Sequence, residues 1–384
     1  MKTRLRQPEA ERTGSGRKGG PSMRNATPEQ RELVTKAMYG DEKDALEALN
    51  TLIAEAPAER VAWVVKNCEN EAVAFKGLDY LIERNELDEL GFVGQFAGFK
   101  SVRDKTIEFI KQSAMQRPGH SKYISLIAEH TRYEDTQDDA IRTLLEIGDF
   151  HRMTSVVKYA ERESARLAAF EHLKASGELD KIRHLAEVCE DPGIRQKSID
   201  ALTQKGEIEP IASVAKNGRF LDSAITAFDY VYGNPDVSTE FVAEIAGTAH
   251  MRKVQLRGVE KLEGDLFQIA KIYRMTRERV TKDACSRILG DKEPADITKA
   301  LCTVNDVNEK DKRVMMAGAS LLVEKLAEQQ EKELLLKVQE ESSVKEISDL
   351  ARLKVYELEN PDNETSTGSD WMTSSGPGFA TASA

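Results

Sequence analysis

Apolar residues recur with a helical period in the middle of the chain, and the whole pattern repeats. Three glycines, Gly148, Gly177 and Gly206, lie 29 residues apart. Apolar residues occupy the positions seven and four before each glycine and five and eight after it, namely Ile141, Leu144, Met153, Val156, Phe170, Leu173, Ile182, Leu185, Ile199, Leu202, Ile211 and Val214. Residues three or four apart share a helix face, so each unit predicts a helix, a turn and a second helix. Glycine suits the turn because it adopts positive φ at a helix end.

The same unit can be followed towards both ends of the chain. Its turn position is taken by Ala56, Asn85 and Ala114 before the glycines, and by Gly233, Gly264 and Gly290 after them. The loop signal Pro118-Gly119 accounts for the longer spacing before Gly148. Each predicted helix is short and has one apolar stripe, so neighbouring units must stack to bury it.

A second feature lies eleven residues before the turn in three units, where the chain has Arg103, Arg166 and Arg195. Arg195 follows the segment Asp191-Pro192-Gly193-Ile194. An Asp-Pro turn that leads into a helix opening with a hydrophobic residue and arginine resembles the HEAT repeat, particularly the short HEAT-like form of phycobilisome-lyase-type proteins. The resemblance covers residues 42–290. Other units depart from it and have Ala45, Ala74 and Gln137 at the arginine position.

The pattern and the resemblance together predict an all-α fold, a right-handed α-solenoid of about nine two-helix HEAT-like repeats with a helical C-terminal cap. We expect a disordered basic arm over residues 1–26, the repeat array over 27–305, capping helices over 306–360 and a disordered tail over 361–384. Within the cap, the apolar spacing predicts long helices over 313–330 and 331–360. The basic arm could tether an acidic partner or be a solvated extension.

Composition and charge narrow the possible functions. The net charge of −11 disfavours general nucleic-acid binding, and no apolar run approaches the length of a membrane span. The charge is uneven, because residues 25–150 contain 15 Lys and Arg against 24 Asp and Glu, whereas residues 151–290 are nearly balanced. An acidic surface of this kind could bind a basic partner or be ordinary solvated surface. Four widely spaced cysteines indicate a reduced, cytoplasmic protein.

No motif predicts catalysis, a cofactor or a metal. The chain has no HExxH, no Gly-rich phosphate loop and no GxSxG. One basic cluster stands out as a candidate contact for an anion or an acidic partner, formed by Lys271, Arg274, Arg277, Arg279 and Lys282. It could equally be exposed charge with no ligand.

The sequence therefore favours a non-enzymatic scaffold or adaptor that binds a protein or peptide on its concave face, with the identity of that partner and the oligomeric state left open. Two alternatives remain. The first is a HEAT-like lyase or modifying enzyme with a concave pocket, as the family resemblance implies. The second is nucleic-acid binding through the basic region 271–287.

Overall fold

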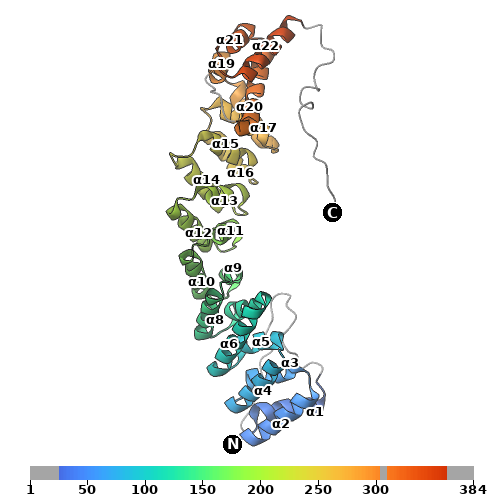
Figure 1. The fold of residues 1–384 in the computed structure, drawn as a ribbon. Coiled ribbons are helices and arrows are strands. Elements are labelled where there is room, and N and C mark those ends of the chain that lie inside the picture. The colour runs from blue at the N-terminus through green and yellow to red at the C-terminus, as the bar shows by residue number, and fades with distance from the viewer. Residues whose placement is uncertain (1–25, 303–308, 361–384) are drawn as a thin grey trace, which may run out of the picture. The chain divides into compact units, whose positions relative to one another are not determined.

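The computed structural model describes residues 26–302 and 309–360. In these two ranges it contains 22 α-helices, one short 3-10 helix and no strand, so the predicted all-α class is confirmed there (Figure 1). The predictions of a basic arm and of a polar tail fall on residues 1–25 and 361–384, which lie outside the described ranges.

The chain divides into two compact units. Among the described residues, unit 1 contains 26–185 and 189–201, and unit 2 contains 186–188, 202–302 and 309–360, so that the division falls within α11 and α12. The helices up to the division are α1 Pro28–Tyr39, α2 Glu42–Glu55, α3 Ala58–Asn67, α4 Glu71–Glu83, α5 Leu87–Phe96, α6 Lys100–Gln116, α7 Ser121–His130, α8 Glu134–Glu146, α9 Phe150–Tyr159, α10 Glu163–Ala175, α11 Leu179–Val188 and α12 Pro192–Lys205. The remaining helices are α13 Ile208–Asn217, α14 Leu221–Gly233, α15 Thr239–Thr248, α16 Arg252–Lys261, α17 Leu266–Met275, α18 Arg279–Gly290, α19 Pro294–Cys302, α20 Glu309–Glu328, α21 Lys332–Glu341 and α22 Lys345–Glu359.

Unit 1 is built from two rows of helices. The helices α2, α4, α6, α8 and α10 pack side by side in one row, which we call the first-helix row. The helices α1, α3, α5, α7 and α9 pack side by side in the other, the second-helix row. Apolar side chains between the rows are buried, among them Leu49, Leu78, Ile110 and Leu144. The spacing of apolar residues predicted this pairing, because each helix has a single stripe to bury.

Unit 2 repeats the arrangement. Helices α14, α16 and α18 form its first-helix row, and α13, α15, α17 and α19 form its second-helix row.

All twelve apolar positions of the three-unit sequence template, which extends from Ile141 to Val214, are buried. The apolar positions that define the repeat in the sequence are therefore the positions that pack in the core of the folded protein.

The regular turns have one backbone geometry. Gly148, Gly177 and Gly206 have φ values of +69°, +73° and +73°, and Asn85 reaches +55° without being glycine. At Asn85 the following amide, that of Glu86, donates to the carbonyl of Leu81, five residues back. This bond is the mark of a Schellman motif, which ends a helix in the left-handed region. The interpretation of these glycines as turn residues is confirmed.

One turn prediction needs correction. Ala114 is not a turn residue, because α6 continues through it to Gln116 and Ala114 is buried. Gly233 and Gly264 lie where turns were predicted, at the end of α14 and between α16 and α17, but they do not have positive φ, so these turns are built differently from those at Gly148, Gly177 and Gly206. Gln330, at the predicted boundary between the helices 313–330 and 331–360, has a φ of +58° and turns the chain between α20 and α21.

The C-terminal segment is also divided differently from the prediction. We expected one helix over 331–360, but the structure has α21 and α22, separated around Ser342 and Val344. The hydroxyl of Ser348 donates to the carbonyl of Gln339 at 2.6 Å, which closes this turn. Serine competes for backbone hydrogen bonds and favours such breaks, and the apolar spacing did not reveal it.

The recurring arginines hold the ends of second helices. Arg103 donates from Nη1 to the carbonyls of Ala97 and Gly98 at 2.8 and 3.0 Å, and Ala97 is the C-cap of α5. Arg166 and Arg195 make the corresponding bond to the C-caps of α9 and α11 at 3.0 Å each. A buried guanidinium thus satisfies carbonyls that a helix end leaves without a partner. The arginine that recurs eleven residues before the turn therefore has a structural role.

Candidate functional site

The predicted basic cluster does not form one exposed surface. Lys271 lies on α17 and is only 3 % exposed. Its Nζ is 2.9 Å from the Oε1 of Glu240, which belongs to α15, the neighbouring helix of the same row. A buried cation must be paired, and the packing of α15 on α17 provides the carboxylate. Lys271 is therefore a correction to the predicted site, since it stabilises unit 2 and does not face solvent.

The other members of the cluster have separate surroundings. Arg274 is 3.0 Å from Glu324 of α20, and the Lys282 ammonium lies 5.5 Å from the centre of the Tyr273 ring. Arg279 is exposed and has Asp283 at 3.9 Å, while Arg277 is exposed in the segment between α17 and α18. These four residues come from two helices and the loop between them, and three of them have a carboxylate or a ring as a neighbour.

A cluster that the sequence reasoning missed lies on the second-helix row of unit 1. The ammonium of Lys66 on α3 is 5.2 Å from the centre of the Trp63 ring, 5.1 Å from that of Phe92 and 4.9 Å from that of Phe96. Phe92 and Phe96 lie on α5, with their ring centres 5.2 Å apart and their planes tilted by 58°. All four side chains are half-buried. We call these four residues the aromatic cluster.

Acidic residues surround this aromatic cluster. Glu59 lies four residues before Trp63 on α3, and Glu89 lies three residues before Phe92 on α5, so each shares a helix face with a ring. The pKa of Glu89 is raised, chiefly because the carboxyl is partly buried and further because the carboxylates of Glu59, Asp88 and Glu86 repel its charge. Carboxylates from two helices therefore lie near one another beside the rings.

The sequence did contain a signal for this cluster. Trp63 and Phe92 are 29 residues apart and stand seven residues after the turn positions Ala56 and Asn85. An aromatic residue at the same register position in adjacent units must come close in a stacked array. This signal lies at partly exposed positions of the helices, whereas the repeat is defined by their buried apolar positions.

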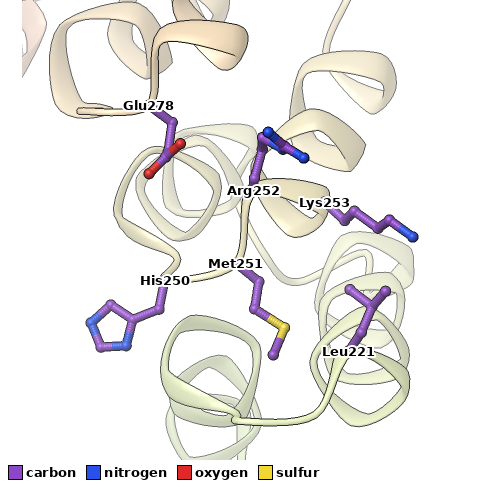
Figure 2. A pocket seen from close by; sticks show the side chains of 6 residues that line it. All are labelled: Leu221, His250, Met251, Arg252, Lys253 and Glu278. Carbon is purple, nitrogen blue, oxygen red and sulfur yellow. The ribbon is translucent and has the colours of Figure 1, made fainter.

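An open hollow of about 310 Å³ lies in unit 2. Leu221 begins α14, Met251 precedes α16 and Glu278 precedes α18, and the remaining lining residues are His250, Arg252 and Lys253. Figure 2 shows the His250 ring and the Lys253 ammonium on opposite sides of this hollow. Its polar groups do not converge as the members of an acid–base pair would.

The cysteines are held as thiols. Burial raises the pKa of the Cys68 thiol to about 11 and that of Cys285 to about 12, and it also raises the pKa of Cys189. A nucleophilic cysteine needs a lowered pKa, so these three groups are structural at neutral pH. Among the described residues, no group of three or more His, Cys, Asp or Glu side chains is placed to hold a metal ion.

No helix within residues 26–302 and 309–360 combines the length and the apolar content that a membrane span needs.

Comparisons with known proteins leave the family open. No family model matches the chain. No curated protein matches it either. Among solved structures, a chain from a study described as "Computational Design of Self-Assembling Cyclic Protein Homooligomers" is 17 % identical, with 77 % of this chain and 100 % of that chain covered. The TM-score of that match is 0.11, so the likeness carries no argument about fold or function.

Proposed function

We propose that this protein is a non-enzymatic helical-repeat scaffold that binds a protein or peptide partner on the face formed by its second helices. In this proposal the helix pairs are HEAT-like repeats that stack as a right-handed α-solenoid, and the protein acts in the cytoplasm. The observation that carries the proposal is the way in which second helices are joined: the same backbone hydrogen bond recurs at four junctions, whereas the exposed side chains of these helices vary.

The recurring part is a backbone hydrogen bond that joins neighbouring second helices at four junctions. The amide that follows the C-cap of one helix donates to a carbonyl near the end of the helix before it. In unit 1, Glu69 donates to Met38 at 3.1 Å and Glu161 donates to Glu129 at 3.1 Å. In unit 2 the corresponding pairs are Arg219 with Glu187 at 2.8 Å and His250 with Lys216 at 2.9 Å. These bonds fix the register of adjacent helices.

The variable part is the set of side chains that this register presents. Two residues before the C-cap, the second helices have Lys66, Gln95 and Lys158 in unit 1 and Lys216 and Arg274 in unit 2, all of which are at least partly exposed. At the same position Glu129, Glu187 and Gly247 are buried. A repeat protein gains specificity in this way, because its packing positions stay alike while its surface positions differ from unit to unit. Within each unit, surface side chains that differ in this way are suited to binding an extended partner.

Affinity purification of the full chain from its native source, followed by mass spectrometry, tests the proposal. We expect a stable partner that is lost when second-helix charges outside the aromatic cluster are reversed in the variant Lys158→Glu/Lys216→Glu. The matched control, Lys43→Glu/Lys76→Glu, changes the same charge on exposed positions of the first helices α2 and α4. The control is expected to retain the partner. Recovery of no partner, or equal loss from both variants, would overturn the proposal.

A further inference from the structure

On the second-helix surface of unit 1, the rings of Trp63, Phe92 and Phe96 lie close to a single ammonium. The Lys66 Nζ lies between 4.9 and 5.2 Å from all three ring centres. By comparison, the Lys261 ammonium lies 5.2 Å from the centre of one ring, that of Tyr232. A cation within about 6 Å of a ring centre is attracted to its face. The three rings together therefore form a seat for a positive charge.

The electrostatics of the surrounding surface also favour a cation. Glu89 lies on the ring-bearing face of α5, and the charges that act on it are those of the carboxylates of Glu59, Asp88 and Glu86. Carboxylates that repel one another are relieved when a cation approaches. Residues 25–150 have nine more acidic than basic residues, so long-range attraction acts in the same direction.

The position of Lys66 suggests how a ligand would enter. Its ammonium stands at the end of a long flexible chain on a half-buried residue, so it can move into solvent without disturbing the backbone of α3. A ligand lysine or arginine could then take its place over the rings. An anionic ligand such as nucleic acid would be repelled by the neighbouring carboxylates.

We propose that the aromatic cluster, together with Glu59 and Glu89, binds a lysine- or arginine-containing peptide segment of a partner protein. One cationic side chain of that segment replaces Lys66 over the rings of Trp63, Phe92 and Phe96, and the carboxylates bind its neighbours. This inference rests on the proposed scaffold function and names the chemistry of its partner. Lys66 acts as an internal substitute that keeps the rings in place while no partner is bound.

Fluorescence anisotropy with the full chain tests this inference. The probe is a labelled twelve-residue peptide of lysine, arginine and glycine, and the control peptide has glutamine at every lysine and arginine. We expect the basic peptide to bind at least about tenfold more tightly, with an affinity that falls as salt increases. Equal binding of the two peptides, or no binding of either, would overturn the inference.

Variants of the chain identify the surface. Trp63→Ala and Phe96→Ala are expected to weaken binding about tenfold each, and Glu59→Gln/Glu89→Gln to reduce its salt dependence. Lys66→Ala is the decisive variant, because removal of the internal competitor is expected to strengthen binding several-fold, an effect that loss of folding cannot produce. Tyr232→Ala in unit 2 is the matched control and should leave the affinity unchanged. Unchanged or weaker binding by Lys66→Ala would contradict the mechanism.

Two further outcomes separate this inference from its foundations. If a partner is recovered from the native source but Trp63→Ala and Lys66→Ala do not affect it, the scaffold function stands and the inference fails. If the affinity for the basic peptide rises tenfold when the seven Lys and Arg residues before Asn25 are changed to glutamine, the chain's own segment is the occupant. The proposal of a partner's peptide would then be wrong.

Discussion

Lys66 on α3 and Lys271 on α17 both belong to second helices, but their surroundings differ. Lys271 is buried and has the carboxylate of Glu240 at 2.9 Å. Lys66 is half-buried and lies about 5 Å from the centres of three aromatic rings. The comparison shows that the charge pattern of a sequence does not reveal which charges are available to a ligand. In the basic cluster of residues 271–282, Lys271 is buried and paired with a carboxylate. In the acidic region of residues 25–150, Lys66 is partly exposed.

The largest expected effect tests the structural role of Lys271. In the variant Lys271→Glu, a second carboxylate would be buried beside Glu240, and we expect the free energy of unfolding to fall by about 3 kcal/mol or more. Arg277→Glu makes the same charge change at an exposed position and should alter it by less than about 0.5 kcal/mol. Urea denaturation followed by circular dichroism measures both. Equal effects of the two variants would remove the distinction between buried and exposed charge in this region.

Arg103 provides a second test, on the side of the aromatic cluster. It holds the end of α5, stacks on Tyr133 with its guanidinium carbon 3.6 Å from the ring centre and donates to the Thr136 hydroxyl at 2.6 Å. We expect Arg103→Met to destabilise the protein by about 2–3 kcal/mol, because the carbonyls of the α5 end lose their donor. Arg103→Gln should cost less, since Gln255 of unit 2 makes the corresponding bond to Ala249 at 2.7 Å. Denaturation midpoints rank the two variants, and the reverse order would contradict the capping role.

Trp63→Ala should have a smaller effect on stability than either of these changes. The ring is half-exposed, so we expect a loss of about 1–2 kcal/mol, far less than for a core tryptophan. Thermal unfolding monitored by circular dichroism measures this loss. If the variant is unfolded at room temperature, Trp63 is a core residue. Its contribution to stability would then not differ from that of the buried Lys271.

Glu89→Gln has the smallest expected effect, and its sign is opposite to the others. The pKa of Glu89 is raised in the folded protein, so ionisation costs folding energy once the pH exceeds the value of the unfolded chain. Removal of this charge should stabilise the protein by a few tenths of a kcal/mol at pH 7, where solvent screens a partly exposed group. At pH 4 both forms are largely protonated and the gain should vanish. Urea midpoints at the two pH values measure this; a gain that persists at pH 4 would point to packing instead of charge.

Much of the fold was predictable because burial is periodic. The apolar positions around Gly148, Gly177 and Gly206 fix two helices and a turn, and all of them pack as expected. The break at Gln330 coincides with the predicted boundary between the helices 313–330 and 331–360, but the turn at Ser342 was not predicted, since no glycine or proline marks it. The end of α6 was misplaced because Ala114 occupies the turn register yet is compatible with a continuing helix.

The candidate site was less predictable than the fold. The buried position of Lys271 depends on its ion pair with Glu240, which lies 31 residues earlier and on another helix. Only the packing of α15 on α17 brings the two together. The aromatic cluster depends equally on the packing of α3 on α5, although the 29-residue spacing of Trp63 and Phe92 indicated it. A helical period shows which residues face inward, but the neighbours of the outward-facing residues come from the next unit.

The backbone bonds that join successive second helices have a consequence for measurement. The amides of Glu69, Glu161, Arg219 and His250 lie just beyond helix ends, yet each is bonded to the preceding helix of its row. Their protons can exchange with solvent only when two neighbouring helices separate, whereas protons inside a helix also exchange when that helix frays. Hydrogen exchange at these four sites would therefore report the coupling between adjacent helix pairs directly. Deuterium uptake there, with and without a partner, would show which junctions the partner tightens.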